Sequence, residues 1–158
     1  MSYDLAVFVP KAAPSDRDEF MKWYHQQTRW EEEGHDYNDP NSAAPELREL
    51  FFELIKEYPP MNGPLQADED DVDDPRVTDY SIGKNLIYAA FAWSQAEDAF
   101  KTLFSLAERH KVGFFDVSSN EAKVWLSDAT GQYVCVHSEK SKKQAESASA
   151  KWWQFWKK

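Results

Sequence analysis

Short apolar runs alternate along this chain with stretches in which apolar residues recur every three or four positions. Five runs are rich in β-branched and aromatic residues, which favours strands: residues 5–9, 77–82, 86–93, 114–117 and 123–126. Three stretches have the spacing of amphipathic helices: residues 15–30, 45–58 and 94–107. The order strand, helix, helix, strand, strand, helix, strand, strand predicts an α+β fold.

Local signals mark where several of these elements begin and end. Ser15 is predicted to cap the first helix, and two prolines at residues 59–60 end the second. Ser94 with Glu97 three residues later predicts a reciprocal capping box at the start of the third helix. Gly113 interrupts the helical pattern and is followed by the second predicted hairpin.

The order of elements contains the β-α-β-β-α-β plan of a ferredoxin-like sheet, with one inserted helix and one inserted acidic loop. We therefore expect residues 1–127 to form an antiparallel sheet packed by helices. Residues 133–136 are predicted to add an edge strand, and residues 128–150 continue as a linker rich in Lys, Ser and Ala. Residues 151–158 form a basic tail rich in tryptophan.

Charge is distributed unevenly along the chain, whose formal net charge is -10 over 158 residues. The segment from Asp128 onward holds six lysines and three acidic residues, so it carries +3 and the remainder carries -13. A body that acidic repels nucleic acid and attracts cationic proteins. We therefore expect a basic protein partner and no nucleic acid.

Nothing in the sequence predicts a membrane span or a secretory signal. The first residues lack a basic region, and their apolar run is too short for a signal peptide. The single cysteine, Cys135, has no internal disulfide partner, which agrees with a reducing compartment. We expect a cytoplasmic protein with no transmembrane segment.

The acidic run lies in a stretch without periodicity, residues 61–75, a length of loop that is often functional. Its six carboxylates are the predicted partner-binding residues: Asp68, Glu69, Asp70, Asp71, Asp73 and Asp74. An EF-hand loop that started at Asp68 or Asp71 would lack both the glycine at position six and the glutamate at position twelve. No metal ligand is therefore assigned, and a hydrated loop without a partner remains the simpler alternative.

Five short motifs carry a resemblance to a known group: YDLAVF at residues 3–8, PPMNGP at 59–64, TDYSIG at 78–83, IYAAFAW at 87–93 and GFFDV at 113–117. Over residues 1–127 the chain resembles a group of small, uncharacterised bacterial proteins. Some members of such groups are similar to immunity partners of secreted bacterial toxins. The resemblance implies an immunity-like role, and it implies no catalytic residue.

Aromatic residues provide a second set of candidate contacts. Tyr80, Tyr88 and Trp93 are expected to line a groove if they face away from the helices. In the tail, four aromatic residues flanked by lysines have the pattern of an anchor for a membrane surface, a protein groove or a second subunit: Trp152, Trp153, Phe155 and Trp156. Docking in a groove or on a second subunit is favoured over a membrane, because so few apolar residues without a lipid chain bind a membrane weakly. A homodimer formed through the tail is therefore one predicted assembly.

Three functions remain open at this level. The first is a non-enzymatic binding protein, an immunity-like inhibitor whose acidic loop occludes a cationic toxin domain. The second is a small metal-dependent enzyme that uses His25, His35 and Asp39, with Asp36 nearby, although their spacing matches no ligand motif. The third is a self-associating structural module that uses the tail. No catalytic residue and no cofactor are assigned, because the chain has no glycine-rich phosphate loop and no nucleophile elbow.

Overall fold

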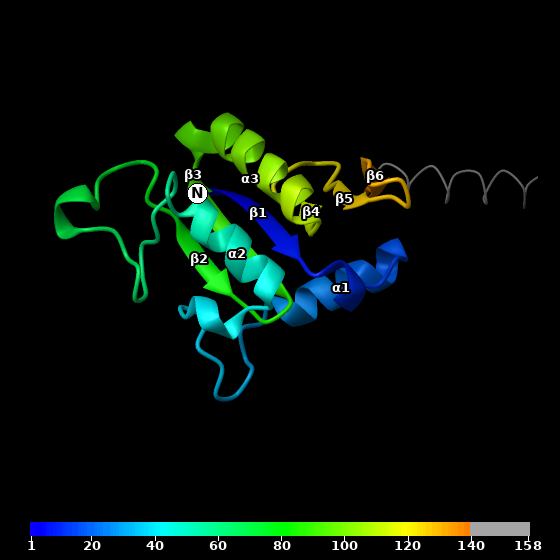
Figure 1. The fold of residues 1–158 in the computed structure, drawn as a ribbon, viewed down its shortest axis with the longest axis horizontal. Helices are drawn as coiled ribbons and strands as arrows, with labels where there is room; N and C mark the ends of the chain where they lie inside the picture. Colours follow the sequence, from blue (N-terminus) through cyan, green and yellow to red (C-terminus); the bar gives the residue numbers. More distant parts are fainter. Residues whose placement is uncertain (140–158) are drawn as a thin grey trace, which may run out of the picture.

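A computed structural model of the chain describes residues 1–139, which form six strands and three α-helices (Figure 1). In chain order these are β1 (Ser2–Phe8), α1 (Arg17–Gln27), α2 (Pro45–Leu54), β2 (Asp79–Ile82), β3 (Leu86–Ala92), α3 (Ala96–His110), β4 (Gly113–Phe115), β5 (Val124–Ser127) and β6 (Tyr133–His137). Single 3-10 turns occur between them. The predicted linker from residue 140 and the predicted tail lie outside the described residues.

The six strands form one sheet with the order β2-β3-β1-β4-β5-β6, and all neighbouring strands are antiparallel. β1 lies between β3 and β4, and it pairs with β3 over its whole length, from Ser2 opposite Ala92 to Phe8 opposite Leu86. The prediction of an α+β fold with an antiparallel sheet packed by helices is confirmed. β6 lies at one edge, as the sequence predicts for residues 133–136.

Helices cover both faces of the sheet, so the molecule has three layers. Along β1, Leu5 and Val7 point into a core shared with α2 and α3, whereas Ala6 and Phe8 point into a core shared with α1. All four are at most 1% exposed. Burial on both faces explains why this strand is an uninterrupted apolar run and does not alternate.

The first helix begins one residue later than predicted. Asp16, and not Ser15, is the N-cap residue, because its carboxylate accepts a hydrogen bond from the backbone N–H of Glu19 at 3.0 Å. Phe20 and Tyr24 then turn one face of α1 toward the sheet, where both rings meet Phe115 edge to face.

The predicted capping box of the third helix does not form. A 3-10 turn at Trp93–Gln95 takes up Ser94, and α3 begins at Ala96 without a side-chain cap. Glu97 instead forms an ion pair with Lys101, one helical turn ahead, at 2.7 Å. The tight turn that joins β3 to α3 therefore decides where the helix starts.

The ends of α2 and α3 also differ from the sequence interpretation. α2 ends at Leu54, four residues earlier than predicted, and turns continue to Tyr58, whose N–H bonds the Leu54 carbonyl at 2.9 Å. α3 ends at His110, three residues later than predicted, and its C-cap residue, Lys111, has the left-handed conformation with φ 56°. Gly113 has another role: it begins β4 where a Cβ atom would overlap the Phe8 ring.

Candidate functional site

The acidic loop, residues 61–77, is closed at its base by backbone hydrogen bonds. Pro60 and Thr78 form a parallel bridge, with Met61 N–H donating to the Thr78 carbonyl at 2.8 Å and Thr78 N–H to the Pro59 carbonyl at 2.9 Å. Thr78 is fully buried. We call residues 59–61 and 78 the neck of the loop. Because the neck is paired, the loop leaves the body and returns at one point beside β2.

Within the loop, short backbone hydrogen bonds follow one another. Ala67 N–H returns to the Pro60 carbonyl at 2.8 Å, and Asp71 N–H to the Asp68 carbonyl at 2.9 Å in a 3-10 turn. Asp74 N–H then bonds the Asp71 carbonyl at 2.9 Å. Figure 1 shows the loop standing out from one side of the molecule, beyond the sheet and the two covering helices. The loop is thus an ordered projection of consecutive turns.

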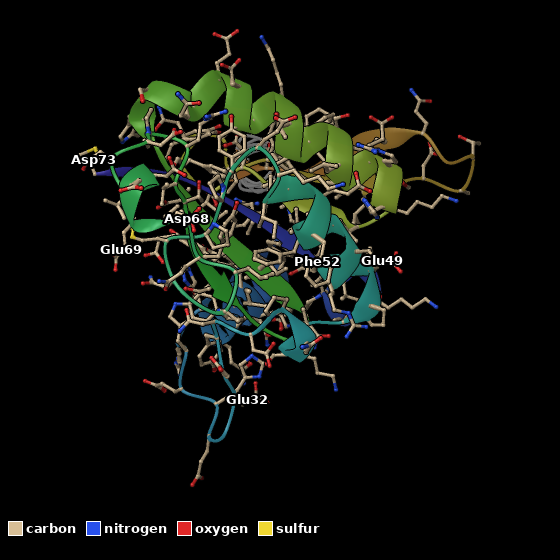
Figure 2. All side chains as sticks on the ribbon, turned by 60° about the vertical axis from the view of Figure 1, so that its left-hand side comes forward. Glu32, Glu49, Phe52, Asp68, Glu69 and Asp73 are labelled. Carbon is tan, nitrogen blue, oxygen red and sulfur yellow. The ribbon has the colours of Figure 1, made fainter. Side chains whose placement is uncertain are left out.

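The predicted partner-binding carboxylates all lie on this projection, and five of the six are exposed. Asp74 is half-buried and pairs with Arg76, whose Nη2 lies 2.9 Å from Oδ2; these hydrogen bonds lower the pKa of Asp74. Within residues 1–139, the other five side chains make no hydrogen bond or ion pair. Figure 2 shows Asp68, Glu69 and Asp73 on the loop, apart from Glu32 on a second loop. Five charges therefore face solvent without an ion pair in the described part of the chain, and the charge of Asp71 lies close enough to Arg76 to help raise the pKa of that arginine.

Apolar side chains accompany these charges on the loop. Met61, Leu65 and Val72 are 52%, 42% and 62% exposed. Large apolar side chains left in water on one segment often belong to an interaction surface. The sequence interpretation used only the charges of this loop and missed these three residues.

The three aromatic residues predicted to line a groove do not lie together. Tyr80 is a correction: its ring is 6% exposed and packs on Phe51 in the α2 and α3 core, while its hydroxyl donates to the Tyr58 carbonyl at 2.8 Å. Burial raises the pKa of Tyr80. Tyr88 points to the opposite face of the sheet and packs against the α1 core. Tyr80 pairs with Ala89, the residue after Tyr88, and successive residues of a strand point to opposite faces. Trp93 lies beyond β3, half exposed, against the Tyr3 ring.

The histidine and aspartate residues of the metal-dependent alternative have separate, local roles. His35 donates from Nε2 to the Ile82 carbonyl at 2.8 Å, and Asp39 accepts from the Asn41 N–H at 2.9 Å. Asp36 accepts from the Asn38 N–H, and His25 is exposed on α1. Nowhere in the described part of the chain do three His, Cys, Asp or Glu side chains gather as a metal would require. The geometry therefore provides no metal site for that alternative.

A buried arginine, which the sequence interpretation missed, ties α1 to the last strand. Arg17 donates from Nη1 to the Ala122 carbonyl at 2.8 Å and from Nη2 to Glu139 at 3.0 Å. Nη1 also lies 3.2 Å from Nδ1 of His137. Since an arginine can only donate, this imidazole nitrogen accepts and the ring is neutral. Burial, together with the Arg17 charge, lowers the pKa of His137 to about 4.

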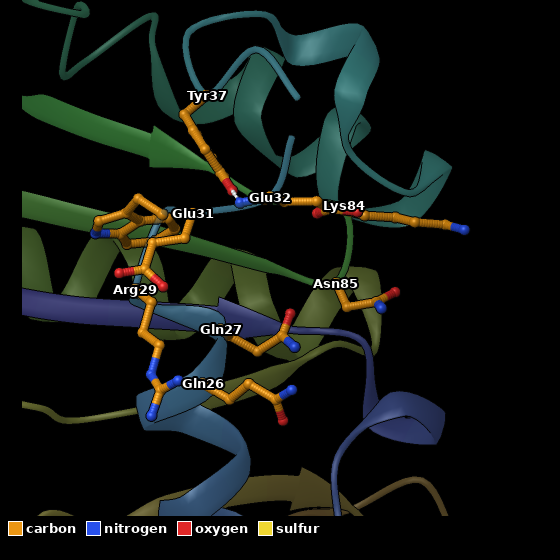
Figure 3. Close-up of a pocket in the computed structure, with 10 residues that line it drawn as sticks. Gln26, Gln27, Arg29, Glu31, Glu32, Tyr37, Lys84 and Asn85 are labelled. Carbon is orange, nitrogen blue, oxygen red and sulfur yellow. Dashed lines mark hydrogen bonds between the residues drawn. The ribbon is translucent and has the colours of Figure 1, made fainter. Parts of the chain in front are cut away.

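A second feature that the sequence did not reveal is a pocket of about 410 Å³ beside the end of α1. Its lining comes from the end of α1, the segment that follows, and the β2–β3 hairpin: Gln26, Gln27, Arg29, Trp30, Glu31, Glu32, Tyr37, Gly83, Lys84 and Asn85 (Figure 3). We call this the amide pocket, because amide side chains enter it from α1 and from the hairpin. Backbone hydrogen bonds fix its wall: Ile82 N–H donates to the Tyr37 carbonyl at 2.8 Å, and Glu32 N–H to the Tyr37 hydroxyl at 2.9 Å.

The backbone at Trp30 has a left-handed conformation, φ 55°. Trp30 lies two residues beyond Thr28, the C-cap residue of α1, and glycine or asparagine is usual where the backbone has this conformation. A bulky residue in this conformation is an outlier that its surroundings must hold. Trp30 is held by edge-to-face contacts with Tyr37 at 5.3 Å and Tyr88 at 6.2 Å. A tryptophan placed directly after a helical stripe was the one sequence signal for this pocket.

The remaining predicted interface residues cannot be placed. Trp152, Trp153, Phe155 and Trp156 lie outside the described residues, and so does the homodimer contact predicted for them. Over residues 1–139, none of the helices combines the length and the apolar character needed to cross a membrane.

The chain was compared with known protein families, curated proteins and solved structures. A scan against protein-family models, a search of curated proteins and a search of solved structures each returned no match to the chain. The geometry defines the class: an α+β domain with a three-layer core, a projecting acidic loop and a separate polar pocket.

Proposed function

We propose that this chain is a non-enzymatic binding protein for a basic protein partner, and that the acidic loop is its main contact. One observation carries the proposal: five exposed carboxylates that form no ion pair within residues 1–139 stand on a loop that its own neck holds in place. Like charges at short range repel one another, so the approach of a cationic surface lowers their electrostatic energy.

Two further properties of the loop support a protein as the partner. The exposed Met61, Leu65 and Val72 provide apolar contact area among the charges, and protein interfaces combine both kinds of contact. The closed neck also restricts the loop before binding, which lowers the entropy cost of association. An immunity-like inhibitor that occludes the cationic active site of a toxin is the specific form of this proposal, and a cytoplasmic location belongs to it.

We also propose that the ferredoxin-like plan describes the first four strands. Their order β2-β3-β1-β4 and their antiparallel pairing support it, as does the placement of α2 and α3 on one face. On this view α1, which covers the opposite face, is the inserted helix.

The test is capture of a partner by three baits. The first is the unaltered chain, and the second carries Asp70→Asn, Asp71→Asn and Asp73→Asn. The matched control carries three other exposed carboxylates changed to amides, Glu33→Gln, Glu49→Gln and Glu108→Gln, which gives the same change in net charge. Each bait is incubated with lysate and secreted fraction at about 0.05 M and about 0.5 M salt, because screening weakens exposed charge contacts.

The proposal predicts a basic protein that is captured by the unaltered chain and by the control, but not by the loop variant, with less capture at high salt. An equal loss of capture by the loop variant and by the control would show that net charge, and not the loop, attracts the partner. Equal capture by all three baits would show that the loop carboxylates do not contribute to binding. Recovery of the chain alone would instead favour self-association, and removal of residues 151–158 would then be expected to change the mass of the protein in solution.

A further inference from the structure

The amide pocket contains polar side chains whose hydrogen-bonding groups are unused. Within residues 1–139, the side chains of Gln26, Gln27 and Asn85 make no hydrogen bond. Each amide offers two N–H donors and one carbonyl acceptor in a fixed plane. In Figure 3, Gln27 extends from α1 and Asn85 from the β2–β3 hairpin, and both line the pocket. The pocket thus presents donors and acceptors from two independent elements.

The charges around the pocket cancel. Arg29 and Lys84 supply two positive charges, while Glu31 and Glu32 supply two negative ones. An anionic ligand such as a phosphate would meet two carboxylates, and a cationic ligand would meet two basic groups. A ligand without net charge avoids both repulsions.

The aromatic part of the lining adds a surface for carbon–hydrogen groups. Trp30 is held in a strained backbone conformation, which places a large ring among otherwise polar lining residues. Tyr37 also contributes a hydroxyl: its oxygen accepts from Glu32 N–H, so its own proton remains available to a ligand. A wholly apolar ligand would leave the amides buried without partners, which is costly.

We propose that the amide pocket binds a neutral, polyhydroxylated ligand, namely one or two sugar rings. Adjacent hydroxyl groups both donate and accept, so they match the planar amides, and the carbon–hydrogen face of a sugar ring packs against Trp30. The volume of about 410 Å³ lies within the range of about 300 to 1,000 Å³ of small-molecule sites. This inference does not depend on the acidic loop.

The experiment uses the full chain and named neutral saccharides: glucose, galactose, mannose, N-acetylglucosamine, maltose and diacetylchitobiose. Binding is followed by amide chemical shifts in NMR and by tryptophan fluorescence. We expect at least one saccharide to cause saturable shifts at Gln27, Trp30 and Asn85, with a Kd of about 1 mM or below. Adenosine monophosphate serves as the anionic probe and choline as the cationic probe.

The decisive variant is Gln27→Ala with Asn85→Ala. Neither side chain has a hydrogen bond within the described part of the chain, so the fold does not depend on them. Their loss is expected to weaken saccharide binding at least tenfold. The control variant, Thr102→Ala with Ser105→Ala, alters a separate groove between α2 and α3 and leaves binding unchanged. The proposal is overturned if no saccharide gives saturable shifts, if the double variant binds as tightly, or if only a charged probe binds.

Discussion

The two faces of the sheet bury different chemistry. The face under α2 and α3 is a continuous apolar core that includes Leu47 and Phe91. The face under α1 has a smaller, aromatic core, and beside it lie the buried Arg17 and His137, as well as the amide pocket. Burying a polar group is favourable only when its partners are placed accurately. We therefore expect one face to supply most of the stability, while the other maintains polar groups in defined positions.

The largest effect is expected on the apolar face. Leu47 is fully buried, so Leu47→Ala leaves a cavity in the core and lowers the free energy of unfolding by about 3 kcal/mol. Leu65→Ala, on the exposed acidic loop, changes it by less than about 0.5 kcal/mol. Urea unfolding measures both. A cost below about 1 kcal/mol for Leu47→Ala would contradict the assignment of this face as the main source of stability.

The α1 face is expected to respond to acid. His137 has a pKa of about 4 in the folded chain and an ordinary value of 6.5, so the unfolded chain binds the additional proton between these values. The stabilisation from neutral His137 is complete above pH 6.5 and is lost as the pH falls toward 4. The expected loss is about 3 kcal/mol, because each unit of pKa difference corresponds to about 1.4 kcal/mol.

This pH effect is separated from the titration of carboxylates by a variant. In His137→Asn the side-chain oxygen still accepts from Arg17 but does not titrate. The difference in unfolding free energy between the two proteins, measured by urea from pH 7 to pH 4, isolates the histidine. Parallel pH profiles would show that His137 is not held neutral.

Gly63 is the point where the acidic loop touches the segment that follows α1. Its φ is 95°, and a Cβ atom there would lie 2.7 Å from the Asn38 carbonyl oxygen. Gly63→Ala is therefore expected to cost about 1 kcal/mol more than Gly34→Ala, which has a positive φ but no atom within 4 Å of the added Cβ. Thermal unfolding compares the two variants. Equal costs would mean that the loop does not rest on Asn38.

The smallest effect concerns the wall of the amide pocket. Tyr37→Phe removes the hydroxyl that accepts from Glu32 N–H and retains the ring against Trp30. We expect a cost of about 0.5 kcal/mol, because the amide is exposed and water replaces the hydroxyl. Hydrogen exchange at the Glu32 amide is expected to rise. Unchanged exchange would show that this bond does not hold the wall.

Sequence patterns predicted the elements well because each pattern reports local burial. The apolar run in the second half of β1 and the largely buried strand β3 are examples. The patterns could not assign α1 to a face, because an apolar stripe shows which side of a helix is buried and not what it is buried against. Arg17 reads as a surface residue near a helix start, and only the arrival of residues 122 to 139 buries it.

The candidate sites divide in the same way. The acidic run could be recognised in the sequence because its charges are consecutive. The amide pocket could not be recognised, because its residues are brought together only by the fold. Tyr80 was misassigned because the sequence shows that it lies in a strand but not which face of the sheet its side chain is on. That face is decided by α2 and α3, which pack over it. The direction of the side chain was therefore decided by contacts distant in sequence.

The paired neck of the acidic loop has a consequence for how such a chain can vary. Since Pro60 and Thr78 are paired with each other, the position of β2 in the sheet does not depend on how many residues lie between them. Insertions and deletions in this interval are therefore expected to change the length of the projection while β2 keeps its register. The sheet and its helices can therefore stay constant while the loop varies in length and sequence.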